Sequence, residues 1–120
     1  MIVTLQFPPK ELSPNARGHW AKLAKAVKAY RLACWADCLA QGVRPSWAAI
    51  VGPINIDMVF YRPSKRHFDE DNLVARMKSG LDGIADALKI DDKYFKLTHR
   101  IAEETGGYVL VDLKGVVKYD

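Results

Sequence analysis

The chain has 120 residues, of which 49% are hydrophobic and 27% charged, and its formal net charge is +4 at neutral pH. This length predicts one globular domain over residues 1–120, with a hydrophobic core of its own. No apolar run is long enough to cross a bilayer, and the first residues do not resemble a signal peptide. We therefore expect a cytoplasmic protein that does not enter a membrane.

The first half of the chain predicts one strand and one long helix. Residues 1–7 are rich in β-branched and apolar side chains and predict a strand that ends at two prolines. A helical pattern then runs from about residue 19 to residue 41, where Gly42 ends it. Its apolar residues fall mostly on one face, and we expect Trp20 to lie in the core.

The second half of the chain predicts a strand, a helix and two further strands. Alternating residues predict the strand over 54–61, and a helix follows over 71–88. That helix is expected to bury Leu73, Met77, Leu81, Ile84 and Leu88. The last strands, over 95–103 and 108–113, are expected to form a hairpin around residues 105–107. The β-α-β-α-β-β order predicts a compact α/β domain with two main helices and a small mixed or antiparallel sheet.

Two cysteines, Cys34 and Cys38, lie four residues apart in the first predicted helix. Adjacent turns of one helix give poor geometry for a disulfide. A zinc site would need two more thiolates or histidines nearby. We therefore expect two buried, free thiols.

Acidic residues gather at both ends of the second predicted helix. Asp69, Asp71 and Asn72 form an Asp-Glu-Asp-Asn motif at its start, and the doublet Asp91-Asp92 follows its end. Capping and the helix dipole account for one or two of these acids. The others repel one another unless a cation is present, and Mg²⁺ or Mn²⁺ suits carboxylate oxygens. The β-α-β layout permits the doublet to return to the first acids.

A calcium-binding loop does not explain the motif, because such a loop needs an acid or amide at position 73 and glycine at position 74. The chain has Leu73 and Val74 there. Magnesium or manganese therefore remains the expected metal.

The chain has a net positive charge but contains a local cluster of acids, which indicates a polyanionic substrate bound next to a metal. This combination predicts metal-dependent hydrolysis of nucleic acid. Basic residues beside the cluster and in the first helix are the expected phosphate contacts. They are Arg17, His19, Lys22, Arg31, Arg62, Lys65, Arg66 and His67.

The acidic motifs resemble those of the RusA family of Holliday-junction resolvases, which occur in bacteria and their phages. The similar segments are Asp69-Glu70-Asp71-Asn72-Leu73, Leu81-Asp82-Gly83, Ile90-Asp91-Asp92, Phe7-Pro8-Pro9 and Ser13-Pro14-Asn15. The resemblance implies a homodimeric endonuclease that uses Mg²⁺, with Mn²⁺ as a substitute and no small-molecule cofactor. Its implied reaction is the paired, symmetric nicking of four-way DNA junctions in recombination and repair.

The family's three catalytic aspartates match Asp69, Asp71 and Asp92 in this sequence, with Asp91 as an auxiliary metal ligand. Asp82 is about 16 Å along the helix from Asp71, so we expect it at the surface or in a dimer interface, away from that metal.

The chain departs from the family at Ala75, where the resemblance implies an essential lysine. Lys78 is the first candidate to replace it. This residue lies on the face of Asp71, and its side chain leans toward the helix N-terminus. Arg76 projects about 140° from Asp71, and it is the second candidate and a further DNA contact.

Two alternatives remain open. A non-catalytic DNA-binding protein would use the basic helix and keep the acids as caps and turn formers, and Ala75 is its best argument. A nuclease of the same fold with flaps or forks as substrate is the other. The variant Asp71→Asn distinguishes the non-catalytic binder from a nuclease. A nuclease should lose cleavage, whereas a DNA-binding protein should be almost unaffected.

Overall fold

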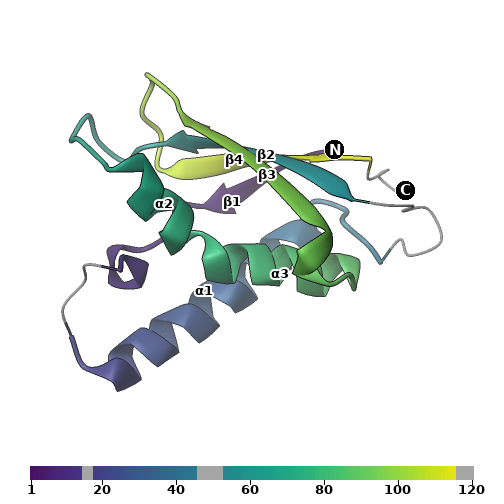
Figure 1. Cartoon of the computed structure of the whole chain (residues 1–120), viewed down its shortest axis with the longest axis horizontal. Helices are drawn as coiled ribbons and strands as arrows, with labels where there is room; N and C mark the ends of the chain where they lie inside the picture. Colours follow the sequence, from purple (N-terminus) through teal and green to yellow (C-terminus); the bar gives the residue numbers. More distant parts are fainter. Residues whose placement is uncertain (15–17, 46–52, 116–120) are drawn as a thin grey trace.

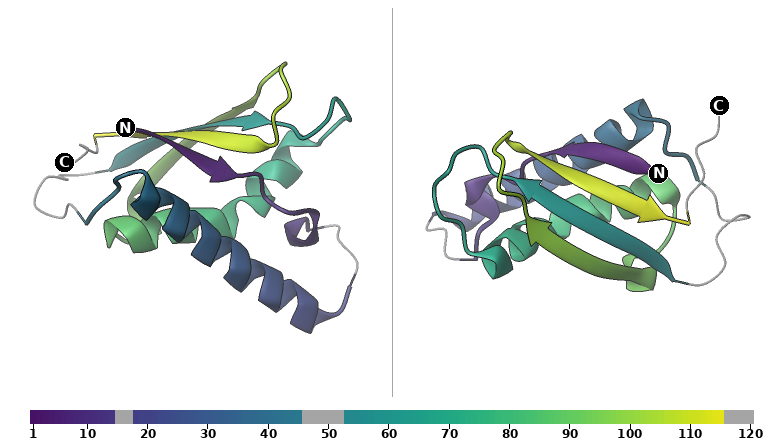
Figure 2. Two further views of the ribbon diagram at one scale, coloured as in Figure 1. Left: turned by 180° about the vertical axis from the view of Figure 1, so that it is seen from behind. Right: turned by 90° about the horizontal axis from the view of Figure 1, so that it is seen from above.

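The computed structural model describes residues 1–14, 18–45 and 53–115. Four strands form one mixed sheet, and the helices cover one of its faces (Figures 1 and 2). The strands are β1 (Ile2–Gln6), β2 (Ile54–Tyr61), β3 (Phe95–Ile101) and β4 (Tyr108–Lys114). The helices are α1 (Trp20–Ala40), α2 (Glu70–Arg76) and α3 (Lys78–Leu88), with 3-10 turns η1 (Lys10–Leu12) and η2 (Asp92–Tyr94). The predicted α/β class and order of elements are confirmed.

The sheet order β1-β4-β2-β3 corrects the predicted hairpin. β4 is antiparallel to both β1 and β2, whereas β3 lies on the far side of β2 and parallel to it. The chain between β3 and β4 therefore crosses the end of β2. There the amides of Gly106 and Gly107 donate to the carbonyls of Arg62 and Tyr61, each at 2.8 Å. The glycines serve this crossover instead of a tight turn between paired strands.

Strand alternation builds the core, because every second side chain of β1, β2 and β4 faces the helices. The buried strand residues are Val3, Leu5, Ile54, Ile56, Met58, Phe60, Val109, Val111 and Leu113. From the helices, the predicted stripe is buried throughout: Leu73, Met77, Leu81, Ile84 and Leu88. This confirms the hydrophobic face of the second predicted helix.

That second helix is interrupted, which the sequence did not predict. Met77 separates α2 from α3, and its amide is shared between the carbonyls of Leu73 and Val74 at 3.1 Å each. Beyond the break, α3 crosses α1 at two glycines. A Cβ atom at Gly80 would lie 2.8 Å from the Tyr30 ring, so the crossing depends on residues without side chains.

The free edge of β1 is closed by the C-terminal end of α1. The Gln41 side chain accepts from the amide of Thr4 and donates to its carbonyl, both at 2.7 Å. The Asp37 carboxylate also accepts from the amide of Gln6 at 3.3 Å. These side chains satisfy backbone groups that a neighbouring strand would otherwise pair.

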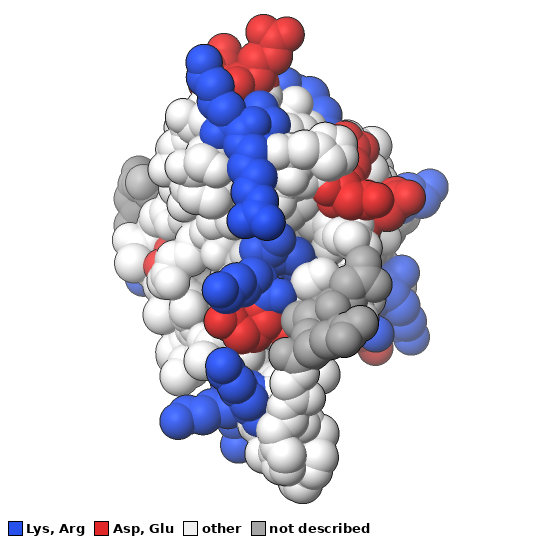
Figure 3. Space-filling view, turned by 90° about the vertical axis from the view of Figure 1, so that its left-hand side faces the viewer, with Lys and Arg blue, Asp and Glu red and all other residues white. Residues whose placement is uncertain are grey.

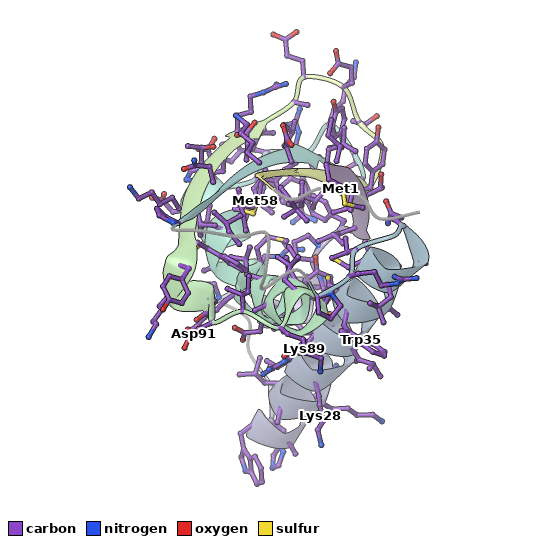
Figure 4. All side chains as sticks on the ribbon, turned by 90° about the vertical axis from the view of Figure 1, so that its right-hand side faces the viewer. Met1, Lys28, Trp35, Met58, Lys89 and Asp91 are labelled. Carbon is purple, nitrogen blue, oxygen red and sulfur yellow. The ribbon has the colours of Figure 1, made fainter. Side chains whose placement is uncertain are left out.

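Only the C-terminal half of α1 packs against the domain. Cys34 and Cys38 are buried, but Trp20, Leu23 and Val27, earlier on the same helix, are exposed. Figures 1 and 4 show the N-terminal half extending beyond the other elements. The prediction that Trp20 lies in the core is therefore wrong. Within the described part of the chain, no helix is long and apolar enough to cross a membrane.

The two cysteines are free and buried, as predicted. Burial raises the pKa of the Cys34 thiol and of the Cys38 thiol to about 12 each. Only the thiolate reacts readily, so we expect neither cysteine of the native protein to react with Ellman's reagent at pH 8. Both should react once urea unfolds the chain. Rapid reaction of a thiol under native conditions would contradict this burial.

Candidate functional site

The acidic residues lie at opposite ends of the β2-α2-α3-β3 unit. Asp69 caps α2 beyond the C-terminal end of β2, whereas Asp92 lies just before β3. β2 and β3 are parallel, with Ile54 opposite Phe95, so the two loops lie at opposite ends of the sheet. Residues 70–88 also correspond to about 28 Å of helical rise. The structure thus does not bring Asp92 to Asp69 and Asp71 within one chain.

The first acidic group sits at the start of α2. Asp69 accepts from the amide of Asn72 at 3.3 Å, which is the capping contact. Glu70 pairs with His99 of β3 at 2.8 Å, as an electrostatic contact in which the ring nitrogen makes no well-directed hydrogen bond. Asp71 is exposed. β3, the strand that follows Asp91-Asp92, does lie beside the start of α2, as the layout permitted. The side chain that contacts the acids there is His99, and not Asp92.

The second acidic group surrounds a hollow of about 450 Å³ between α1, α3 and η2. Its lining residues are Arg31, Asp82, Ala85, Asp86, Lys89, Ile90, Asp91 and Asp92. Figure 4 shows Lys89 and Asp91 on the same side of the molecule as Trp35 of α1. The doublet that follows α3 therefore meets the acids of α3 and not those of α2.

Asp82 and Asp92 form a carboxyl pair in this hollow. Burial raises the pKa of Asp82, and a hydrogen bond with Asp92 raises it further, while the charges of Arg31 and Lys78 lower it. Two carboxylates this close do not both stay ionised without a compensating positive charge. A divalent cation held between them would supply this compensation. Lys78, the expected substitute for the family lysine, acts here on Asp82.

Two other acids of the hollow have structural partners. Arg31 holds Asp86 through two hydrogen bonds of 2.7 and 2.9 Å. The hydrogen bond from Arg31 lowers the pKa of Asp86 and keeps this carboxylate ionised. Asp91 caps η2 by accepting from the amide of Lys93 at 2.9 Å, which lowers the pKa of Asp91. Asp82 and Asp92 are therefore the acids best placed to bind something else.

Among residues 1–14, 18–45 and 53–115, no three His, Cys, Asp or Glu side chains converge as a complete metal site. Mg²⁺ does not require one, because it commonly keeps several waters and uses one or two carboxylates together with substrate phosphates. The Asp82–Asp92 pair fits that type of site. Mg²⁺ or Mn²⁺ held there would supply an oriented water and neutralise charge on a phosphate.

The loop between β2 and α2 carries an exposed basic group. Lys65, Arg66 and His67 are exposed, while Arg62 is half-buried and donates to the carbonyl of Arg66 at 3.3 Å. Figure 3 views the side where this loop projects, and shows Lys and Arg side chains in a column with acidic groups beside it. This surface suits a phosphate backbone next to acidic side chains.

Of the DNA contacts predicted in and before the first helix, only some are exposed and without a structural role among the residues that the structure describes. His19 is the N-cap of α1 and accepts from the amide of Ala21 at 3.2 Å. Lys22 is exposed, whereas Arg31 is engaged in the acidic hollow. Arg17 and the loop residue Asn15 lie outside the described residues.

Arg76 is buried, which does not fit the expected contact with DNA. Its guanidinium lies 5.5 Å from the Phe7 ring and 5.7 Å from the Phe68 ring, and it donates to the carbonyl of Pro8 at 2.5 Å. Burial lowers the pKa of Arg76. Arg76 therefore ties the first loop to α2.

The hollow contains two acids that the sequence analysis did not assign to a site, Asp82 and Asp86. The sequence analysis excluded Asp82 from the metal site because it lies far along the helix from Asp71. In the structure Asp82 instead lies next to Asp92. The available signal was the four-residue spacing of Asp82 and Asp86, which places both on one face of α3. That face ends next to the acidic doublet.

No protein-family model matches the chain. The sequence is 38% identical over 123 residues to a protein of Xylella fastidiosa (strain Temecula1) that is described as an uncharacterized protein. The similarity covers 97% of this chain and 77% of that relative. It therefore includes both acidic groups.

Proposed function

We propose that this chain, which belongs to the same family as the uncharacterized Xylella fastidiosa protein, is a Mg²⁺-dependent endonuclease that cleaves branched DNA. The observation that carries the proposal is the Asp82–Asp92 carboxyl pair, in a hollow of a protein with net positive charge. The resemblance to the RusA family supports four-way junctions as the substrate, with flaps or forks as the alternative. We place the activity in the cytoplasm, in recombination and repair.

Residues in the hollow and next to it have distinct roles in this proposal. Asp82 and Asp92 would hold Mg²⁺, or Mn²⁺ as a substitute, and that metal supplies the activated water. Lys78 lies one turn before Asp82 on α3 and would stabilise negative charge on the phosphate or on the leaving oxygen. Arg31 holds Asp86 and so keeps this second acid away from the metal.

The resemblance assigns catalysis to Asp69 and Asp71 as well, with Asp91 as an auxiliary ligand. In a single chain Asp69 and Asp71 form a separate group about one helix length from Asp92. They would bind a metal of their own or take part through a second subunit. Variants of the two acidic groups, made separately, decide which one supports cleavage.

The basic loop before α2 would bind the DNA backbone. Lys65, Arg66 and His67 are exposed, and Arg62 lies at the base of the loop. Contacts of this kind orient the duplex without reading its sequence. The cut would then depend on the shape of the branched substrate.

A second candidate function is DNA binding without cleavage. Two observations favour it: Ala75 replaces the lysine that the resemblance implies, and the described residues hold no complete three-ligand metal group. In that case Asp69 and Asp91 serve as caps, as both do in the structure.

The decisive experiment incubates the purified protein with an end-labelled four-way junction in Mg²⁺, in Mn²⁺ and in EDTA. We expect paired, symmetric nicks with either metal and none with EDTA. Linear duplex, flap and fork substrates of the same sequence serve as controls for structure selectivity. A junction that is shifted in a gel but uncut under all three conditions supports the binder.

A further inference from the structure

We propose that Lys89 contacts a phosphate group of the DNA beside the Asp82–Asp92 pair, and so binds the substrate in the hollow. This inference rests on the proposed function and adds a residue to the same site. Lys89 directly follows the last residue of α3, on the side of the molecule that Figure 4 shows, and it lines the hollow. Its backbone conformation, its side-chain contacts and its charge support this role.

The backbone of Lys89 has an unusual conformation. Its φ is 56° and its ψ is 43°, in the left-handed helical region, and it is the one non-glycine residue with positive φ in the part of the chain that the structure describes. A Cβ atom makes this conformation costly, so glycine is the usual residue directly after a helix. Gly42, which follows α1, has a φ of 93° and illustrates the usual choice. A lysine at position 89 in spite of this cost indicates a use for its side chain.

The helix dipole does not account for this lysine. A positive charge is favoured near the C-terminal end of a helix, but it can lie within the last turn, where no strained backbone is needed. The last turn of α3 holds no basic residue and instead contains Asp86, whose charge is unfavourable there. Two local rules are thus broken three residues apart, and Asp86 and Lys89 both line the hollow. Exceptions of this kind gather at functional sites.

The ammonium group of Lys89 is free to bind a ligand. Arg31, the other cation of the hollow, is held by Asp86 through hydrogen bonds of 2.7 and 2.9 Å. Lys89 is exposed, and it forms no ion pair with any acid among the described residues. Its charge still acts on the hollow, because the pKa of Asp86 is lowered mainly by the hydrogen bond from Arg31 and also by the charge of Lys89. A bound anion would give this lysine a partner.

The charge of the hollow suits a phosphate that binds together with a metal. Its four aspartates, Arg31 and Lys89 have a net charge of −2 (2 − 4) when all of them are ionised. One Mg²⁺ would bring this sum to zero, and a phosphodiester would then add a negative charge. Lys89 can contact that charge directly, whereas Arg31 cannot do so without releasing Asp86. Lys78 influences Asp82 but is not among the residues that line the hollow.

Two substitutions separate the effect of the backbone from the effect of the charge. Lys89→Gln removes the charge and keeps a side chain that strains the backbone, whereas Lys89→Gly removes both. We expect the folding equilibrium constant of Lys89→Gly to be about fivefold higher than that of Lys89→Gln, as measured by urea denaturation. A glycine variant that is no more stable than the glutamine variant would overturn the inference, because lysine would then carry no cost at this position.

The salt dependence of junction binding tests the contact itself. Each phosphate contact adds about 0.9 to the slope of log affinity against log salt concentration. In a fixed concentration of Ca²⁺, which also binds carboxylate oxygens, we expect Lys89→Gln to lower this slope by about one and the affinity by about tenfold. Lys93→Gln is the matched control, because Lys93 is exposed in η2 and does not line the hollow. Equal slopes for these two variants would contradict the contact.

Cleavage gives a second readout. The single-turnover rate in Mg²⁺ should fall at least about tenfold in both Lys89 variants, and less than about threefold in Lys93→Gln. The glycine variant would then be more stable and less active, which a merely structural lysine would not produce. Unchanged cleavage by both Lys89 variants would overturn the inference. If the original chain binds the junction without cutting it, the proposed nuclease fails, and the salt slopes still decide whether Lys89 contacts phosphate.

Discussion

Asp82→Asn and Asp92→Asn are each expected to lower the single-turnover rate of Mg²⁺-dependent junction cleavage by about a thousandfold. A metal contributes several kcal/mol to stabilising the charge of the transition state, and each 1.4 kcal/mol corresponds to about tenfold in rate. Each variant removes one carboxylate of the pair that we propose to hold the metal. Junction affinity, measured by gel shift in EDTA, should stay the same or rise, because a negative charge is lost near DNA.

Asp86→Asn is the matched control for these variants. Asp86 lies in the same hollow and loses the same charge, but it is held by Arg31 and has no proposed role at the metal. We expect its cleavage rate to fall by less than about tenfold. Asp71→Asn tests the other acidic group. If it abolishes cleavage while Asp82→Asn does not, the reaction takes place at the start of α2.

Gly83→Ala should lower the free energy of unfolding by about 2 kcal/mol, which is the second large effect. A Cβ atom at position 83 would lie 2.5 Å from the carbonyl oxygen of Arg31 and 3.0 Å from the amide nitrogen of Trp35. Both are backbone atoms of α1, so relief requires the two helices to move apart. The higher helix propensity of alanine recovers about 1 kcal/mol of a larger overpacking cost. Urea denaturation monitored by tryptophan fluorescence measures the difference.

Gly18→Ala is the control for this substitution. A Cβ atom at Gly18 has no heavy atom within 4 Å, and its backbone has no positive φ. We expect a change within about 0.5 kcal/mol. Equal unfolding midpoints for the two variants would show that α1 and α3 do not approach closely at Gly83.

Periodicity predicted much of the fold because burial on one side leaves a pattern in the sequence. The alternation of residues 54–61 and the stripe from Leu73 to Leu88 both have the predicted burial. Strand order leaves no such pattern. The glycine-rich residues 105–107 are typical of a hairpin turn, but they do not determine whether β3 and β4 pair. The position of β4 between β1 and β2 depends on tertiary packing.

The candidate site was predicted in part for the same reason. The sequence identified the acidic doublet, but spacing along the chain did not show which acids it would meet. A parallel pair of strands joined by a helical segment places the start and the end of that segment at opposite ends of the sheet. Asp92 must then lie near the end of α3, where Asp82 is within reach, and far from the cap of α2.

The first helix shows a different gap between sequence and structure. Periodicity shows which apolar residues share one side of a helix. It does not state what covers that side. Leu23 and Val27 have the periodicity of core residues while the chain itself leaves them exposed.

The contacts of Gln41 with both backbone groups of Thr4 determine where the sheet can grow. The amide side chain occupies the positions that the peptide group of an added strand would take, so the β1 edge is terminated by a helix end. The β3 edge is the other end of the sheet order, and a strand from another polypeptide would have to add there. Edge-to-edge addition through β3 alone would therefore join two copies and then stop, because each copy has its other edge closed.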